Sequence, residues 1–197
     1  MHQQQKKVIH MTTFETPGKA NTAAAAAIAV EKAKALDCPI VLSSNTGESA
    51  ETVLAKAAEL GYTGKVVVVR NATNAGRKGV NMMTPETKQS LLERGCAVVG
   101  AANALSAGER SFSTKLQGVY PLEIMAHTLR MFGQGMKVCV ECATMAMDAD
   151  ELPFQTPVVA LGGTGTGLDT AIVLTPSYSS SLLDTKIHEV LCKPALQ

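Results

Sequence analysis

Four short runs dominated by Val, Ile, Leu and Ala stand out along the chain. They cover residues 39–44 (PIVLSS), 65–70 (KVVVVR), 96–101 (CAVVGA) and 157–161 (PVVAL). Strands buried on both faces show such continuous runs, whereas strands with one face in water alternate hydrophobic and polar residues. Two further strand-like runs cover residues 170–175 and 187–192. The pattern therefore predicts a sheet that is covered by helices on both faces.

Segments with the helical spacing of apolar residues alternate with these runs. The spacing predicts helices from Asn21 or Thr22 to about Leu36, over 49–60 ahead of Gly61, over 85–95 with Thr84 as N-cap and Gly95 as stop, and over 121–132. Residues 136–147 are apolar on nearly every side, which predicts a helix buried in the core or against a second subunit. Because one sheet face cannot cover such a helix on all sides, we expect it in a homo-oligomer interface, with full burial inside the monomer as the alternative.

The alternation of strands and helices predicts an α/β fold, a three-layer α/β/α arrangement with a mostly parallel sheet. No linker divides the chain, so we expect one domain over residues 1–197, in which 1–13 form an N-terminal extension that could hold a short strand. Open parallel sheets bind ligands beyond the carboxyl ends of their strands. The loops that follow the strands are therefore the first place to look for a site.

These loops are rich in Ser, Thr, Asn and Gly. They cover residues 43–49 (SSNTGES), 71–76 (NATNAG), 102–110 (ANALSAGER) and 162–167 (GGTGTG). In the first loop, short hydroxyl side chains surround Gly47 at the start of a predicted helix, and a helix N-terminus attracts anions. This loop is the best candidate for a phosphate site; the alternative is that its residues only cap the helix and turn the chain.

Three other motifs give weaker evidence for a functional site. The GGTGTG run has Leu168 where a dinucleotide fingerprint needs glycine, and a strand-like run follows it, which favours a ligand-facing or hairpin loop. Cys139 and Cys142 have C-x-x-C spacing without a second pair, so we interpret them as buried structural thiols. Residues 103–118 are polar without helical periodicity, which predicts a long functional loop. Within it Arg110 is a candidate to bind a phosphate or carboxylate, or is a solvated surface arginine.

Composition excludes several classes of partner. Eighteen Lys and Arg against 17 Asp and Glu leave a net charge of +1, and 4% aromatic residues without Trp offer little for base stacking, so nucleic acid and anionic membranes are disfavoured. The longest apolar run, 23–30, is too short to span a bilayer. The start of the chain lacks the pattern of a secretory signal, and five Cys fit reduced thiols, so we expect a cytoplasmic protein.

Several blocks resemble one protein family. The run IVLSSNTGESA (40–50) resembles the start of the C-terminal α/β domain of pyruvate kinase. The blocks at 104–124 (ALSAGERSFSTKLQGVYPLEI), 130–149 (RMFGQGMKVCVECATMAMDA) and 162–174 (GGTGTGLDTAIVL) resemble the stand-alone pyruvate kinase C-terminal-like α/β domain proteins of archaea and some bacteria. The similarity covers about residues 14–194.

The resemblance implies the fold of the kinase's regulatory domain and bound flavin mononucleotide (FMN). The residues that match the family's phosphate turn are Ser43, Ser44, Asn45, Thr46, Gly47, Glu48 and Ser49; those that match its polar loop are Ser106, Glu109 and Arg110; those that match its Gly-rich loop are Gly162, Gly163, Thr164 and Gly165. The chain departs from the family at 71–74, where NATN stands in place of a His-containing turn, and Thr73 is a further candidate there.

The resemblance does not imply kinase activity, because one α/β domain uses up the chain and leaves no catalytic barrel. The expected function is binding of a phosphate-bearing small ligand, FMN in the first place. The alternatives are a flavin-dependent enzyme of unknown substrate and a structural or regulatory oligomeric subunit.

Overall fold

The computed structural model describes residues 10–73 and 79–195. The strands are β1 (Thr12–Phe14), β2 (Ile40–Ser43), β3 (Val66–Arg70), β4 (Ala97–Gly100), β5 (Val158–Gly162), β6 (Thr170–Thr175) and β7 (Lys186–Pro194). The α-helices are α1 (Thr22–Leu36), α2 (Glu48–Leu60), α3 (Pro85–Glu93), α4 (Ala107–Leu116), α5 (Pro121–Arg130) and α6 (Gln134–Asp148). The 3-10 helix η1 (Lys19–Asn21) precedes α1, and η2 (Ser179–Asp184) lies between β6 and β7. The six predicted strands are confirmed, and the N-terminal extension holds the short strand β1.

The strands form one mixed, mostly parallel sheet in the order β1-β7-β6-β5-β2-β3-β4. Strands β5, β2, β3 and β4 run parallel to one another, and β1 is parallel to β7. Only β6 is antiparallel, to both β5 and β7. All other strands therefore end at the same edge of the sheet, which we call the carboxyl edge. The pairing of Gly162 with Thr170 makes the Gly-rich loop a hairpin at this edge, as the sequence predicts.

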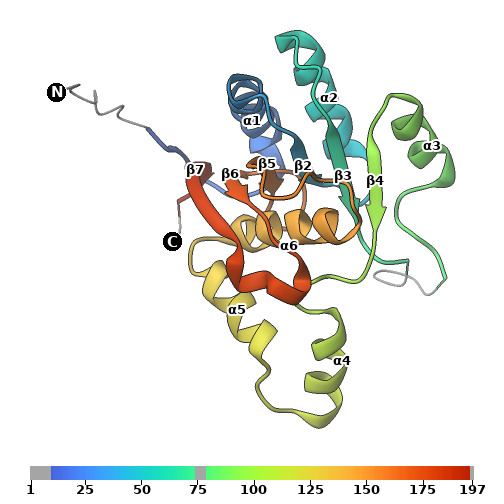
Figure 1. Cartoon of the computed structure of the whole chain (residues 1–197), viewed down its shortest axis with the longest axis vertical. Helices are drawn as coiled ribbons and strands as arrows, with labels where there is room; N and C mark the ends of the chain where they lie inside the picture. The colour runs from blue at the N-terminus through green and yellow to red at the C-terminus, as the bar shows by residue number, and fades with distance from the viewer. Residues whose placement is uncertain (1–9, 74–78, 196–197) are drawn as a thin grey trace.

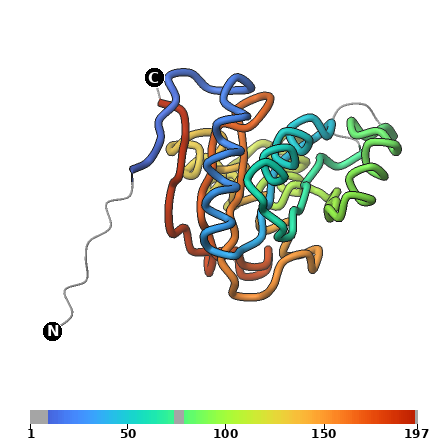
Figure 2. The backbone as a smooth tube through the Cα atoms, turned by 90° about the horizontal axis from the view of Figure 1, so that it is seen from above, coloured from blue at the N-terminus to red at the C-terminus, as the bar shows by residue number. Residues whose placement is uncertain are grey.

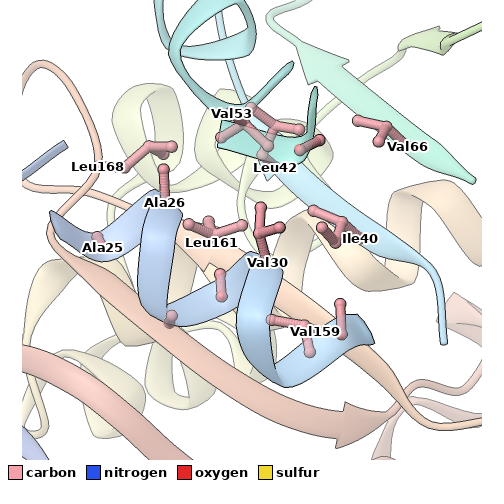
Figure 3. Close-up of a cluster of buried hydrophobic side chains, with 14 of the residues drawn as sticks. Ala25, Ala26, Val30, Ile40, Leu42, Val53, Val66, Val159, Leu161 and Leu168 are labelled. Atoms are coloured by element: carbon pink, nitrogen blue, oxygen red, sulfur yellow. The ribbon is translucent and has the colours of Figure 1, made fainter. Parts of the chain in front are cut away.

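Helices cover both faces of the sheet, which confirms the three-layer α/β/α arrangement. Figures 1 and 2 show α1, α2 and α3 on one side and α6, with α5 behind it, on the other. Neighbouring residues of β2 enter different cores, because Ile40 packs with the α1 side and Val41 packs with the α6 side. Figure 3 shows Val30 of α1 between Ile40 and Leu161 of the sheet. Burial on both faces explains why the hydrophobic runs do not alternate.

The chain changes direction across the sheet between β2 and β5. From β2 it proceeds through α2 and α3 to β3 and β4, and then returns through α4, α5 and α6 to β5 on the other side of β2. The connection after β2, through α2, covers one face of the sheet, and the connection that leads into β5, through α6, covers the other. Such a switch point opens a crevice at the carboxyl edge, which is the usual ligand position in open α/β sheets.

Helix α6 is buried inside the single chain. Its residues between Gly135 and Met147 are all buried except Val138, which is half-buried. The sheet contacts one side of α6, and α5 and η2 contact the other. The expectation that residues 136–147 form a subunit interface is therefore wrong, because elements of the same chain provide the cover. Self-association itself stays a prediction. Among the described residues, no helix has the length and apolar character needed to cross a membrane.

The expectation of a long irregular loop at 103–118 is also wrong, because α4 occupies most of it. A contact outside the segment stabilises this helix. The Glu109 carboxylate of α4 accepts hydrogen bonds from the Leu122 and Glu123 amides at 2.9 and 3.3 Å. These amides belong to the first turn of α5, so Glu109 caps α5 and joins the two helices into an arm of residues 107–132, which we call the α4–α5 arm.

Replacing either of two helical glycines by alanine should change the free energy of unfolding, in opposite directions. A Cβ atom on Gly135 of α6 would lie 2.1 Å from the Thr170 hydroxyl oxygen, whereas one on Gly108 of α4 would meet nothing within 4 Å. We expect Gly135→Ala to lower the free energy of unfolding by roughly 1–3 kcal/mol through overpacking. The control Gly108→Ala should raise it by up to about 1 kcal/mol, because alanine favours helix. Urea denaturation measures both; equal stabilities would contradict the packing described at α6.

Candidate functional site

A cavity of about 410 Å³ lies at the carboxyl edge, at the switch point between β2 and β5. Its walls come from the loop at 43–49, the end of β3 with Asn71, one side of α6, and the Gly-rich loop, with Met82 and Asn103 at the rim. The loops after β2 and β5 therefore meet at one site, although more than 100 residues separate them in the sequence.

The 43–49 loop contributes every residue except Gly47 to the cavity wall. Gly47 instead shapes the loop: its φ is 98°, and a Cβ atom there would lie 2.4 Å from the Thr87 side chain. The buried Ser44 hydroxyl accepts a hydrogen bond from the Ala50 amide at 3.3 Å, so it caps α2. The first main-chain hydrogen bond of α2 begins only at the Glu51 amide. The Glu48 and Ser49 amides come before it, at the positive end of the helix.

A buried carboxylate shapes the Gly-rich loop. Asp169, which is fully buried, accepts hydrogen bonds through Oδ2 from the Gly18 amide at 2.8 Å and the Thr164 amide at 3.1 Å. Thr164 is thus tied to Asp169 and does not line the cavity, and neither does Gly162, which packs under α6. The residues of this loop that do line the cavity are Gly163, Gly165, Thr166 and Gly167. Sequence reasoning missed Asp169.

Arg70, at the end of β3, is the cationic side chain that the sequence analysis missed on the sheet side of the cavity. A Cβ atom on the neighbouring Gly100 would lie 2.8 Å from Arg70 Nε, so the guanidinium packs closely over β4. Within the described residues, Nε is buried without a hydrogen-bond partner, and no carboxylate lies at ion-pair distance from Arg70. Buried polar groups in native proteins almost always have partners, and an ordered water or a bound ligand could supply one for this donor.

The opposite wall of the cavity is a face of α6. The residues that form it are Gln134, Lys137, Val138, Glu141, Cys142 and Met145, which recur every three or four positions. Lys137 and Glu141 form an ion pair in which the two side chains are only 5% and 6% exposed. Lys137 pairs with Glu141 Oε2, and the Leu105 amide donates to Glu141 Oε1 at 3.1 Å. The i,i+4 spacing of Lys137 and Glu141 indicates this ion pair in the sequence. The segment as a whole is so apolar that the spacing is easily overlooked.

The thiols of α6 are unsuited to nucleophilic chemistry. Burial raises the pKa of the Cys139 thiol and that of the Cys142 thiol, and the nearby Glu141 carboxylate raises the Cys142 pKa further. Both groups therefore stay protonated near neutral pH. Cys139 Sγ donates to the Ala160 carbonyl oxygen at 3.4 Å. The interpretation of Cys139 and Cys142 as buried thiols is confirmed. Within the described ranges, no group of three or more His, Cys, Asp or Glu lies close enough together to hold a metal ion.

Besides Gly47, Gly162 and Thr164, three further predicted site residues lie away from the cavity wall. Thr73 is exposed just beyond β3, and Arg110 is exposed on the outside of α4. Ser106 is buried as the N-cap residue of α4, where its carbonyl oxygen accepts from the Arg110 amide at 2.8 Å. In the second loop Asn71 lines the cavity, and its amide donates to the Asn45 side chain at 3.0 Å. Asn74 lies outside the described residues.

Comparison with models of known protein families finds none that matches the chain.

Proposed function

We propose that this protein binds a phosphate-bearing small ligand, FMN in the first place, in the cavity at the carboxyl edge. The observation that carries the proposal is the meeting of the 43–49 loop with the unpaired Arg70 on one cavity. The cavity volume, about 410 Å³, lies within the usual range of small-molecule sites.

The phosphate end of the ligand belongs at the start of α2. There the Glu48 and Ser49 amides and the Thr46 hydroxyl offer donors at the positive end of a helix. Arg70 adds a guanidinium, whose planar fork suits phosphate oxygens. The negative charge of Glu48 is compensated by an ion pair with Lys19. The local charge therefore favours an anion although the whole chain is close to neutral.

The rest of the cavity suits the ring system of a flavin. Val69, Val138 and Met145 give it apolar walls, and Lys137 and Glu141 add polar contacts at one side. Aliphatic and thioether surfaces can cover the face of an aromatic ring. The resemblance to the stand-alone pyruvate kinase C-terminal-like proteins supports FMN over other phosphate esters. When bound, FMN could supply hydride and electron chemistry, so a flavin-dependent enzyme of unknown substrate is the second candidate. Regulation through ligand binding in an oligomer is the third.

Arg70 and Arg110 give a matched test of the phosphate position. Arg70→Met should weaken binding of inorganic phosphate and of FMN by about 1.5–3 kcal/mol, because a hydrogen bond to a charged oxygen is lost. Thr46→Val should cost about 1–3 kcal/mol for the same reason. Arg110→Met, outside the cavity, should leave both affinities unchanged. Titration calorimetry measures these affinities, and visible absorbance follows FMN; wild-type affinity in both cavity variants would count against this site.

Pyruvate kinase activity is not expected, because the described residues form one α/β unit around an open seven-stranded sheet and include no catalytic barrel. A coupled assay with phosphoenolpyruvate, ADP and magnesium should show no turnover above the background. Turnover that is lost in the Arg70→Met and Thr46→Val variants would overturn this expectation.

We also propose that the protein forms a homo-oligomer through the α4–α5 arm rather than through α6. Val119, Ile124 and Met131 line a shallow hollow of about 420 Å³ on the arm and are 79%, 54% and 74% exposed. Phe112, Leu116 and Phe132 of the same arm are also more than half exposed. Six such side chains offer on the order of 500–700 Å² of apolar surface, close to the ~800 Å² that each partner buries in a standard interface. A second copy of the chain supplies a matching apolar surface, since two-fold interfaces are self-complementary.

A charge placed in the hollow tests this interface. Ile124→Asp should shift the protein to a monomer of 20.6 kDa in sedimentation equilibrium, because a carboxylate would be buried in the interface. Leu183→Asp is the control, since Leu183 of η2 is 85% exposed and lies outside the arm. A wild-type protein that is already monomeric at micromolar concentration would exclude the interface.

A further inference from the structure

The ion pair between Lys137 and Glu141 is buried in a helix whose other buried residues are nearly all apolar. Their side chains are only 5% and 6% exposed, and their neighbours on α6 include Cys139, Val140 and Ala143. Taking two charges out of water costs free energy, and an apolar pair of similar volume is often as stable or more stable. Stability of the fold alone therefore gives no reason for charged residues at these two positions.

The pair lines the cavity and is held in place from behind. The Leu105 amide donates to Glu141 Oε1, and Lys137 Nζ donates to Glu141 Oε2. An ammonium has three donors, and within the described residues Glu141 is the recorded hydrogen-bond partner of Lys137. A carboxylate has about four acceptor positions, of which these contacts use two. Lys137 thus retains donors and Glu141 retains acceptors, side by side in the cavity wall.

A donor next to an acceptor matches a ligand edge on which the two roles are reversed. The edge of a cyclic imide has a carbonyl oxygen beside a ring N–H. The carbonyl oxygen can accept a hydrogen bond from an ammonium while the N–H donates one to a carboxylate. The pyrimidine ring of a flavin has such an edge, whereas a simple sugar phosphate and inorganic phosphate have none.

We propose that Lys137 and Glu141 form a subsite that recognises the imide edge of the ligand, with Lys137 donating to a ring carbonyl and Glu141 accepting from the adjacent N–H. This inference rests on the proposed binding of FMN and adds what the 43–49 loop and Arg70 do not supply, namely selection among phosphate-bearing ligands. The phosphate end gives affinity, and the pair on α6 gives ring specificity.

The test compares FMN with FMN methylated at ring nitrogen N3, which keeps the phosphate and loses the N–H. The wild-type protein should bind FMN at least about tenfold more tightly than the methylated ligand, since a hydrogen bond to a charged group is lost and the Glu141 carboxylate is left facing a methyl group. In the double variant Lys137→Met/Glu141→Leu this ratio should fall close to one. Binding of inorganic phosphate should be unchanged in the double variant.

The double variant removes both charges and keeps α6 apolar, so neither charge is left unpaired in the core. Its thermal unfolding shows whether it folds; if it does not, the ratio measured on the wild-type protein decides alone. Equal affinity of the wild-type protein for the two ligands, or an unchanged ratio in a folded double variant, would overturn the subsite and leave the proposed function standing. Failure of the wild-type protein to bind either inorganic phosphate or FMN would overturn both.

Discussion

Helix α6 can lie close to the carboxyl end of β5 and the start of β6 because glycines stand at both contacts, Gly162 on β5 and Gly135 on α6, where a Cβ atom would meet Thr170. A Cβ atom on Gly162 would lie 2.5 Å from the Gly135 carbonyl oxygen and 3.0 Å from the Cys139 amide nitrogen. Any larger residue at either position would push the first turn of the helix away from the sheet. The wall formed by Lys137 and Glu141 begins within the same turn, so the shape of the cavity depends on this close approach.

The same contact explains how the site is closed on both sides of the sheet. The 43–49 loop leaves β2 toward α2 on one face, and α6 crosses the other face. The cavity at the switch point between β2 and β5 thus has polar loops on one side and a buried helix face on the other. Of the charges that line it, Glu48 is paired with Lys19 and Glu141 with Lys137, which leaves the positive charge of Arg70 uncompensated within the described residues.

The sequence predicts those features that local pattern determines. Strands buried on both faces give continuous hydrophobic runs, and Thr84 caps α3 by accepting from the Thr87 amide, as its position before Pro85 predicts. The carboxyl-edge position of the 43–49 loop follows from the order of the elements. Helix α4 was missed because a tertiary contact stabilises it, from Glu109 to the start of α5. No periodicity within residues 103–118 carries that information.

The choice between Arg70 and Arg110 shows the same limit at the site. Arg110 stands in a polar segment and looks available for a ligand, whereas Arg70 looks like the polar end of a hydrophobic strand. Strand register decides between them: Arg70 pairs with Gly100 on β4, where the absent side chain leaves room for the guanidinium. In a parallel sheet the last residue of a buried strand lies at the ligand edge by geometry. The position of a charged residue at the end of a buried run is therefore fixed by the strand, whereas that of a charged residue within a polar stretch does not follow from the sequence.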